Sequence, residues 1–416
     1  MRRNRANQKN HIEWQDVTLS DLGTVARGKS KHRPRNDPSL LGGEYPFIQT
    51  SDIKHSNFYV NSYSQTYNEK GLAQSKLWPK GTMCMTIAAN IAETAILGFP
   101  ACFPDSVVGF IPDPHKADVK FVKYALDYSK HNFQKTAKGT AQDNLSLEKI
   151  DTLKIKAPPL AAQEKIASVL SAYDDLIENN EKRIKILEEM AQRLYSEWFV
   201  KFKFPGHEKV KMVESGTQYG MIPEGWEVSP LRTLTKYISR GLAPTYDDQG
   251  KTKVINQKCI RNFRLNFDKV RSQNRAISAE KQLYFGDILI NSTGVGTLGR
   301  VTQVYEELQS YTADTHVTIV RPSINVFIDF LGLAAFYHQE DFERLGAGAT
   351  GQTELSRDSI GNLAIVIASQ KLMMDFSQIV RAGRKEAIIL QNKNKILSRI
   401  RDFLIPQLVT GKRELT

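Results

Sequence analysis

The sequence predicts an α+β fold in which two similar mixed α/β domains are joined by two long coiled-coil helices. One observation behind this prediction is an internal repeat at a constant offset of 210 residues. A repeat of this length indicates a tandem domain, because solenoid repeats run to roughly 20–50 residues. The other observation is a sustained heptad pattern late in each half. The repeated positions are Thr140, Gln142, Leu145, Ser146, Ile150, Leu153 and Ile155, which match Thr350, Gln352, Leu355, Ser356, Ile360, Leu363 and Ile365.

Each half shows the same order of parts. Short runs rich in Val, Ile, Thr and aromatic residues come first and are typical of strands. They lie at 45–49, 82–87 and 106–111, and at 253–257, 287–291 and 315–320. A short amphipathic helix follows, at 118–130 and 327–343. The predicted parts are a first domain at 1–158, a central helix at 159–204, a polar linker at 205–222, a second domain at 223–368, and a second helix with tail at 369–416.

The first long helix is the clearest periodic signal in the chain. It is bounded by Pro158-Pro159 and Pro205, where helices commonly begin and end. Apolar residues spaced alternately by four and three predict a coiled-coil seam, with Asn180, Ala191 and Trp198 in the same spacing. About 37 residues at 1.5 Å each would make a rod of roughly 55 Å. The seam residues are Ile166, Leu170, Tyr173, Ile177, Ile184, Leu187 and Leu194.

The second long helix repeats this register at the same offset. Its seam residues are Phe376, Val380, Leu390, Leu397 and Leu404. Gly383 and Arg401 interrupt the seam, and Pro406 is predicted to end the helix. We expect the two helices to pair with each other, because one chain supplies both. The alternative is that each is an ordinary helix packed on its own domain.

Positive charge is concentrated in two segments. The chain carries a net charge of +12, and residues 1–35 hold nine Lys or Arg against three acids. Residues 251–275 hold eight against one. Clustered basic charge is typical of a protein that binds a polyanion. A solvated face on a basic protein is the alternative that charge alone leaves open.

The composition also bounds location. No stretch of about 18 apolar residues is present, so we expect no membrane span. The basic N-terminus lacks the apolar run of a signal peptide. Cys84, Cys102 and Cys259 show no metal-ligand spacing, and so sparse a set fits a reducing cytoplasm.

Two glycine motifs match nucleotide-binding patterns by letter only. Gly23–Ser30 fits the P-loop pattern, but Pro34 and Pro38 exclude the helix that must follow it. Gly294–Gly299 fits GxGxxG, but the residues after it alternate like a strand, which favours a hairpin turn.

A third motif resembles a nuclease. Pro104-Asp105 with Asp118-Val-Lys120 fits a metal-binding P-D…D-x-K pattern. Asp118 opens a helical run, however, so a helix N-cap is the simpler interpretation. Neither a catalytic set nor a metal or cofactor site can be identified from spacing in this chain.

Several ordered passages resemble the specificity subunit of type I restriction–modification systems. They include the run from Gly139 to Ile166, Tyr219-Gly-Met-Ile-Pro-Glu-Gly-Trp-Glu-Val228, the run from Phe285 to Arg300, and Tyr45-Pro-Phe-Ile-Gln-Thr-Ser-Asp-Ile53. The resemblance covers nearly the whole chain, and the set appears twice. It implies two target-recognition domains that each read half of a bipartite DNA site. The long helices would pack antiparallel about a pseudo-twofold axis and fix the gap between the half-sites.

The same resemblance implies the partners. They are double-stranded DNA, two adenine-N6 methyltransferase (modification) subunits, and restriction/translocase subunits, which together act in host defence. S-adenosylmethionine, ATP and Mg²⁺ would belong to those subunits, and this chain would be non-catalytic. One departure is Ala88–Glu93, which lacks the glycines of the matching Ser292–Thr297. The two half-sites should therefore differ.

Phosphate contacts require Lys or Arg on loops, and base contacts require amide or forked side chains. In the first half the candidates are Arg27, Lys29, Lys31, Arg33, Arg35, Gln49 and Gln142. In the second half they are Arg240, Lys251, Lys253, Asn256, Gln257, Lys258, Arg261, Arg264, Ser292, Thr293 and Gln352. The competing hypotheses are a stand-alone DNA methyltransferase or nuclease, and a coiled-coil adaptor that never meets DNA.

Overall fold

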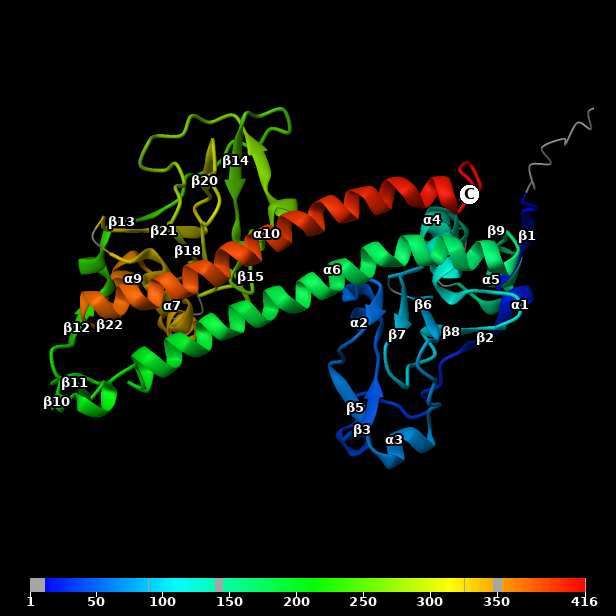
Figure 1. The fold of residues 1–416 in the computed structure, drawn as a ribbon, viewed down its shortest axis with the longest axis horizontal. Helices are drawn as coiled ribbons and strands as arrows, with labels where there is room; N and C mark the ends of the chain where they lie inside the picture. The colour runs from blue at the N-terminus through cyan, green and yellow to red at the C-terminus, as the bar shows by residue number, and fades with distance from the viewer. Residues whose placement is uncertain (1–11, 89, 139–144, 325, 347–353, 416) are drawn as a thin grey trace, which may run out of the picture. The chain divides into compact units, whose positions relative to one another are not determined.

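The computed structural model describes residues 12–88, 90–138, 145–324, 326–346 and 354–415. The chain forms two compact units. Unit 1 consists of Met1–Lys182 with Leu390–Thr416, and unit 2 consists of Arg183–Ile389. The helices α6 (Leu160–Tyr195) and α10 (Gln370–Leu408) each contribute to both units (Figure 1).

Unit 1 is built on a five-stranded sheet with the order β2-β8-β6-β7-β4. All neighbours pair antiparallel except β4 and β7, which are parallel. Every residue of β6 and β7 is buried, as expected of strands covered on both faces. The strands are β2 (Gly23–Arg27), β4 (Tyr59–Val60), β6 (Met83–Thr86), β7 (Thr94–Leu97) and β8 (Val107–Pro112). Two smaller sheets pair β3 (Leu41–Phe47) with β5 (Gln65–Tyr67) and β1 (Gln15–Val17) with β9 (Ile155–Ala157).

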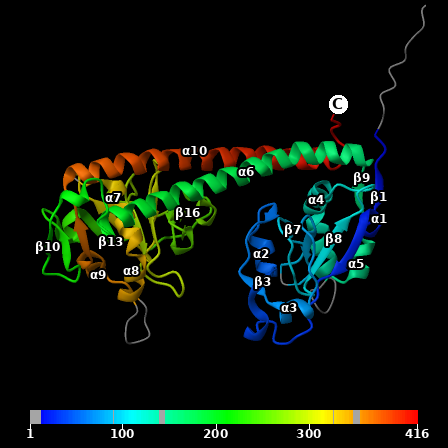
Figure 2. The same cartoon turned by 60° about the horizontal axis from the view of Figure 1, so that its bottom comes forward.

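Helix α4 (Val119–Lys138) lies between this sheet and α6 (Figure 2). The Asp118 carboxylate accepts a hydrogen bond of 2.9 Å from the Phe121 amide, which confirms the predicted N-cap. On the side of α4 that meets α6, Lys120 Nζ donates to Ser171 Oγ at 3.1 Å. The shorter helices of unit 1 are α1 (Leu19–Leu22), α2 (Thr50–His55), α3 (Glu69–Ala73), α5 (Leu147–Thr152) and the 3₁₀ turn Pro38–Leu40.

Unit 2 contains a four-stranded antiparallel sheet, β13-β21-β18-β19, and a three-stranded sheet, β17-β14-β20. The strands are β13 (Thr235–Arg240), β14 (Thr252–Ile255), β17 (Arg271–Gln273), β18 (Ile288–Asn291), β19 (Val301–Gln303), β20 (Tyr311–Ala313) and β21 (Val317–Pro322). Two-stranded pairs are β10 (Met212–Glu214) with β11 (Met221–Pro223), β12 (Glu227–Pro230) with β22 (Ala364–Ile367), and β15 (Ile260–Arg261) with β16 (Arg264–Leu265). Its helices are α7 (Ile328–Tyr337), α8 (Gln339–Gly346), α9 (Arg357–Asn362), and the 3₁₀ turns His207–Lys209, Leu231–Leu234, Gln257–Cys259 and Phe267–Lys269. The segment predicted as a linker therefore contains the β10–β11 hairpin.

The repeated sequence motif has a structural role in each unit. Ser146 and Ser356 cap α5 and α9, because each hydroxyl accepts a hydrogen bond from the amide three residues later. Leu145 and Leu355 before the caps are fully buried. The strand after each helix then pairs with an earlier strand of the same unit, as β9 with β1 and β22 with β12. This part of the repeat thus encodes a capped helix and its packing.

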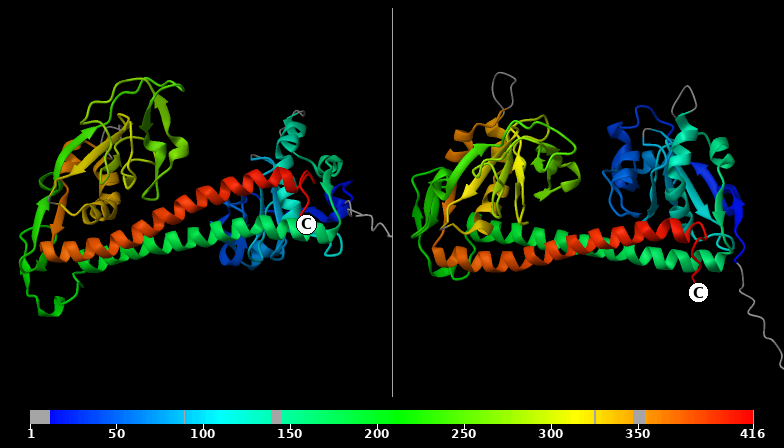
Figure 3. Two further views of the ribbon diagram at one scale, coloured as in Figure 1. Left: turned by 45° about the horizontal axis from the view of Figure 1, so that its top comes forward. Right: turned by 90° about the horizontal axis from the view of Figure 1, so that it is seen from above.

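The two long helices pack side by side and antiparallel (Figure 3), as predicted. In unit 1, Asn180 contacts Asn394, and in unit 2 the Trp198 ring lies 5.9 Å from the Phe376 ring. Both contacts obey one register, because Trp198 follows Asn180 by as many residues as Phe376 precedes Asn394. A π-helical turn, Ser196–Val200, follows α6.

The prediction that Pro406 ends the second helix is wrong, because α10 continues to Leu408. Proline lacks one amide donor, which removes a single hydrogen bond in the last turn of the helix. The turn is held instead by the Thr410 hydroxyl, which donates to the Pro406 carbonyl at 2.6 Å. Leu408 and Val409 are buried in the core of unit 1 beside Leu170.

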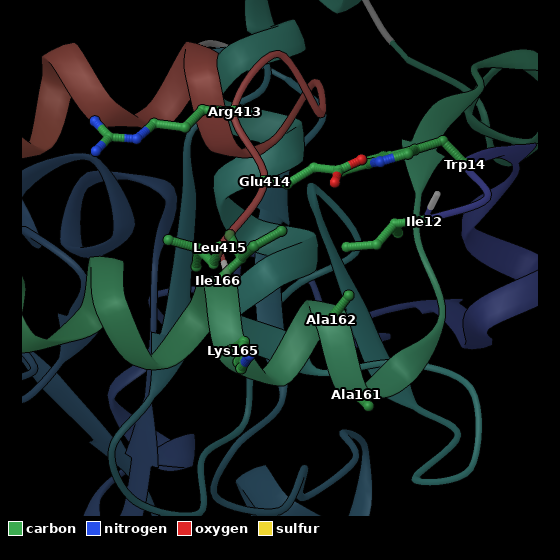
Figure 4. A pocket seen from close by; sticks show the side chains of 9 residues that line it. All are labelled: Ile12, Trp14, Ala161, Ala162, Lys165, Ile166, Arg413, Glu414 and Leu415. Atoms are coloured by element: carbon green, nitrogen blue, oxygen red, sulfur yellow. The ribbon is translucent and has the colours of Figure 1, made fainter. Parts of the chain in front are cut away.

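The C-terminal tail folds back over the start of α6 (Figure 4). Leu415 lies near Ile166, and Glu414 lies near Trp14. Together these elements border an apolar pocket in unit 1. Its lining is Ile12, Trp14, Ala161, Ala162, Lys165, Ile166, Arg413, Glu414 and Leu415.

Candidate nucleic-acid interface

The turn between β18 and β19 is shaped by three glycines. Gly294, Gly296 and Gly299 have φ angles of 104°, 69° and 77°, a region that residues with a side chain rarely adopt. Because β18 and β19 pair antiparallel, the predicted hairpin turn is confirmed. The GxGxxG letters therefore serve turn geometry, whereas a dinucleotide-binding loop must open a helix.

Polar side chains gather at the base of this turn. Thr293 Oγ1 lies 2.7 Å from His316 Nδ1, and Thr293 forms a β-bridge with Glu354. Arg240 donates to Glu354 Oε1 and to the Leu355 carbonyl, both at 2.9 Å. Burial lowers the pKa of the Arg240 guanidinium, although Glu354 opposes this effect. We call Arg240, Gln257, Thr293, His316 and Glu354 the turn cluster.

Two buried amide oxygens beneath the turn have no hydrogen-bond donor within the described part of the chain, namely Gln257 Oε1 and Asn291 Oδ1. The Asn291 amide donates to the Gln257 backbone carbonyl at 3.1 Å. A Cβ atom on Gly294 would lie 2.7 Å from Gln257 Oε1, so the glycine also makes room for this side chain. Buried acceptors of this kind require a donor, which a bound water molecule can supply inside the protein.

The predicted basic segment of unit 2 divides into two groups. Lys251, Lys258 and Arg261 are exposed at the ends of β14 and β15. Lys253 is half-buried, and its ammonium donates to Ser272 Oγ at 2.7 Å. These cations remain candidates for phosphate contacts.

Three predicted DNA contacts in unit 2 are engaged inside the protein. Arg264 makes a bidentate ion pair with Glu188 of α6, at 2.7 and 2.6 Å. Ser292 is fully buried, and its hydroxyl lies 2.6 Å from Thr318 Oγ1. The Asn256 side chain accepts from the Lys258 amide and so caps a 3₁₀ turn. Sequence could not reveal these partners, most of which lie far along the chain.

In unit 1 the basic candidates lie at the end of β2 and in the coil that follows it. Arg27, Lys29 and Lys31 are exposed. Arg33 and Arg35 both form ion pairs with Asp105, with the Arg33 Nη2 to Asp105 Oδ2 distance at 3.1 Å. Asp105 of the nuclease-like motif is therefore an arginine partner in this structure.

The polar candidates of unit 1 are less exposed to a ligand. Gln49 Nε2 donates to Gln65 Oε1 at 2.7 Å, and the Gln49 backbone amide donates to Asp52. Gln142, like Gln352 in the second half, lies outside the described residues. In the glycine-poor loop, Ala92 takes a φ of 63°, so a residue with a side chain occupies the strained conformation there.

The seam residues lie along the helix pair. Those buried are Ile166, Leu170, Ile177, Ile184, Phe376, Val380 and Leu390. Those partly exposed are Tyr173, Leu187, Leu194, Leu397 and Leu404. Arg401, which interrupts the seam, forms an ion pair with the buried Asp174. Gly383 brings α10 close to Leu187, whose Cδ2 lies 3.6 Å from where a Cβ would be.

The structure also places the P-loop-like motif. Gly23–Arg27 is strand β2, and coil follows it, whereas a phosphate loop joins a strand to a helix. Across the described residues no group of three or more His, Cys, Asp or Glu could hold a metal ion. No described helix is long and apolar enough to cross a membrane. The three cysteines are buried free thiols.

Sequence reasoning missed His316 and Glu354 in the turn cluster, and Asp314 beside it. Asp314 accepts a hydrogen bond of 2.9 Å from the His316 amide, and burial raises the pKa of its carboxyl group. Glu354 directly precedes the repeated Leu355-Ser356, and this position next to the repeat could have identified it as a site residue.

Comparisons with known proteins agree with this architecture. A family model described as Type I restriction modification DNA specificity domain matches residues 11–189. The chain is 24% identical over 419 residues to the type I restriction enzyme MjaIX specificity subunit of Methanocaldococcus jannaschii, covering 96% of this chain and 93% of that protein. It is 23% identical over 258 residues to the MjaVIII specificity subunit of the same organism, covering 62% and 56%.

A solved structure shares the fold. The S subunit of a type I restriction–modification system from M. genitalium matches with a TM-score of 0.62 at 19% identity, covering 98% of both chains. The sequence relatives, the family model and this shared fold lead to one conclusion. The chain belongs to the specificity (S) subunits of type I restriction–modification systems and is the non-catalytic, DNA-recognition subunit of such an enzyme.

Proposed function

We propose that each unit reads one half of a bipartite DNA site and that α6 and α10 set a fixed gap between the halves. The observation that carries this proposal is the repeat of one architecture in both units, each attached to the same helix pair. At 1.5 Å per residue, the 36 residues of α6 span about 54 Å. Coiled-coil helices resist bending far better than a flexible linker does, so they suit a spacer.

Within unit 2 we assign DNA contact to the turn cluster and to the exposed cations Lys251, Lys258 and Arg261. The polar side chains of Thr293 and His316 at the base of the turn suit contacts with base edges. In unit 1 the exposed Arg27, Lys29 and Lys31 suit phosphate contacts. Because the loop around Ala92 lacks the glycines of the unit 2 turn, the two units should read different sequences.

We also propose that two methyltransferase subunits dock on the helix pair, one at each unit. Exposed apolar side chains support this. Ile396 and Ile400 of unit 1 are 57% and 40% exposed. Ile186 and Met190 of unit 2 are 54% and 61% exposed, and they stand at the same positions of the 210-residue repeat. Two equivalent apolar patches suit two copies of one partner.

Restriction/translocase subunits would then join this modification complex. S-adenosylmethionine, ATP and Mg²⁺ would be bound by the partners, and the complex would act in the cytoplasm, where three unpaired thiols are stable.

Selection of methylated sites from random DNA tests the main proposal, with the methyltransferase subunits present. We expect two short motifs separated by a fixed number of unspecified base pairs. A single uninterrupted motif would contradict the spacer role.

Docking has its own test. Ile400→Asp should reduce the methyltransferase subunits per complex from two to one in native mass spectrometry, and Met190→Asp should do the same. Lys185→Asp, at an exposed position of the same helix, is the control that should keep both. Full occupancy in the two apolar variants would argue against these patches.

A further inference from the structure

A polar pair interrupts the apolar seam of the helices. Asn180 and Asn394 are each 7% exposed, and Asn180 Nδ2 donates to Asn394 Oδ1 at 2.8 Å. Asn394 Nδ2 in turn donates to Glu181 Oε1 at 3.0 Å. The neighbouring seam residues Ile177 and Leu390 are buried and apolar. A buried amide is tolerated here because its partner is also an amide.

The internal repeat makes a different pairing conceivable. Since α10 is the repeat of α6, the α6 helix of one copy could pair with the α6 helix of another copy in the same antiparallel register. The position of Asn394 would then be taken by its repeat equivalent, Ile184. In a pair of α10 helices the position of Asn180 would be taken by Leu390. A pair of two α6 helices or of two α10 helices is called a like pair. Each like pair would therefore bury asparagine amides against aliphatic side chains.

A buried ion pair also disfavours like pairs. Asp174 is 4% exposed and forms an ion pair with Arg401, while the Tyr124 hydroxyl donates to its other oxygen. In an α6–α6 pair the position of Arg401 would be taken by Ala191, which leaves the carboxylate without its cation. In an α10–α10 pair the position of Asp174 would be taken by Arg384, which places two arginines together. Removing one partner of a buried ion pair is strongly destabilising.

The ends of the helices differ in size as well. Leu408 and Val409 pack into the core of unit 1. Their repeat equivalents, Trp198 and Phe199, pack into the core of unit 2. An α6–α6 pair would force the two large aromatic residues into the space that leucine and valine fill, and overpacking of this kind is destabilising.

We infer that the Asn180–Asn394 and Asp174–Arg401 layers are a pairing code that joins the first half of the chain to the second half and rejects like pairs. One polar residue on each helix meets its complement only in the mixed pair, as single polar seam residues do in coiled coils. The code ensures that an assembled subunit carries one copy of each recognition unit. Its bearing on DNA rests on the proposed function.

The test uses the complete protein cut in the exposed turn of the β10–β11 hairpin, between Ser215 and Gly220. Both pieces stay assembled, because each unit contains residues from both. Cut protein is prepared with two different tags on the N-terminal piece, mixed, dissociated in denaturant and re-annealed. Capture on one tag then reports, by mass spectrometry, whether the other N-terminal piece is bound. Co-synthesis of the two pieces from a split gene gives the same readout where re-annealing fails.

Wild-type pieces should assemble only as mixed pairs. The variant that removes both layers, with Asn180→Leu, Asn394→Leu, Asp174→Ala and Arg401→Ala, should assemble and add N-terminal like pairs, which wild type lacks. A variant that removes one layer should add fewer, because the other layer still disfavours like pairs. The control Ile177→Leu, in an apolar layer of α6, should match wild type. Like pairs in wild type, or their absence from the variant that lacks both layers, would overturn the code. Because no DNA is present, this result is independent of the site selection that tests the proposed function.

Discussion

Removal of one heptad from each long helix should shorten the gap between the two DNA half-sites. The deletion takes residues 181–187 from α6 and residues 387–393 from α10, which face each other in the observed register. It keeps Asn180 and Asn394 paired, and it keeps Glu188 for Arg264. Seven residues shorten a helix by about 10.5 Å, which equals about three base pairs at 3.4 Å each.

The deletion also has a rotational consequence. A heptad returns the seam to the same face, so the units should not turn relative to the helix axis. Three base pairs turn the duplex by about 100°, because one turn takes 10–10.5 base pairs. The shortened protein should therefore select a gap about three base pairs shorter and bind it more weakly, with both half-motifs unchanged.

The assay is site selection from random DNA with the methyltransferase subunits bound, followed by affinity measurement on the selected gap. Replacing the same heptads by others of equal length and equal seam residues is the control, and it should leave the gap unchanged. An unchanged gap in the deletion variant would refute the spacer role. Altered half-motifs would refute the separation of reading from spacing.

Three further predictions concern single side chains. Arg264→Gln should lower the unfolding free energy of unit 2 by about 1–2 kcal/mol in chemical denaturation, because it breaks the ion pair with Glu188. The control is Arg261→Gln at an exposed position nearby. A loss of DNA affinity without a loss of stability would instead indicate that Arg264 contacts DNA. Lys258→Ala should weaken binding alike on all sequences and reduce the slope of log affinity against log salt by about one; sequence-dependent weakening would place this lysine on a base instead. Burial raises the pKa of Asp314 in the folded state, so the folded protein binds this proton more tightly than the unfolded chain does. The stability gained from this proton is fully present at low pH. It is lost as the pH rises through the pKa of the folded state. Asp314→Asn, which keeps an acceptor, should therefore gain melting temperature over wild type as the pH rises from about 4 to about 7, and a constant difference would contradict this.

Sequence was sufficient for the parts of the fold that repeat a simple period. The heptads located both long helices because 3.5-residue spacing has one structural meaning over such a length. The strands at 83–86 and 288–291 were predicted from short apolar runs with Thr or Ile that are bounded by turn residues. The helix end predicted at Pro406 was wrong because the last turn of a helix can tolerate one missing amide donor.

The candidate interface was only partly predictable. Composition drew attention to the basic segments but could not show that Arg264 and Arg35 are paired with acids far along the chain. The same limit hid Ser292, whose hydroxyl is buried against a neighbouring strand. Side-chain direction depends on tertiary packing, and one sequence does not contain that information in any local pattern.

Unit 1 is built from two separated stretches of the chain, so its synthesis is completed after that of unit 2. Unit 2 is one uninterrupted stretch of chain, whereas the core of unit 1 closes only around Leu408 and Val409. At about 5–20 residues per second, a ribosome needs on the order of 10–45 s between Lys182 and Leu408. During that time the apolar face around Leu170 lacks its final cover. The recognition unit that is synthesised first is therefore the last to mature, and a chain released too early would keep this surface open to aggregation and proteolysis.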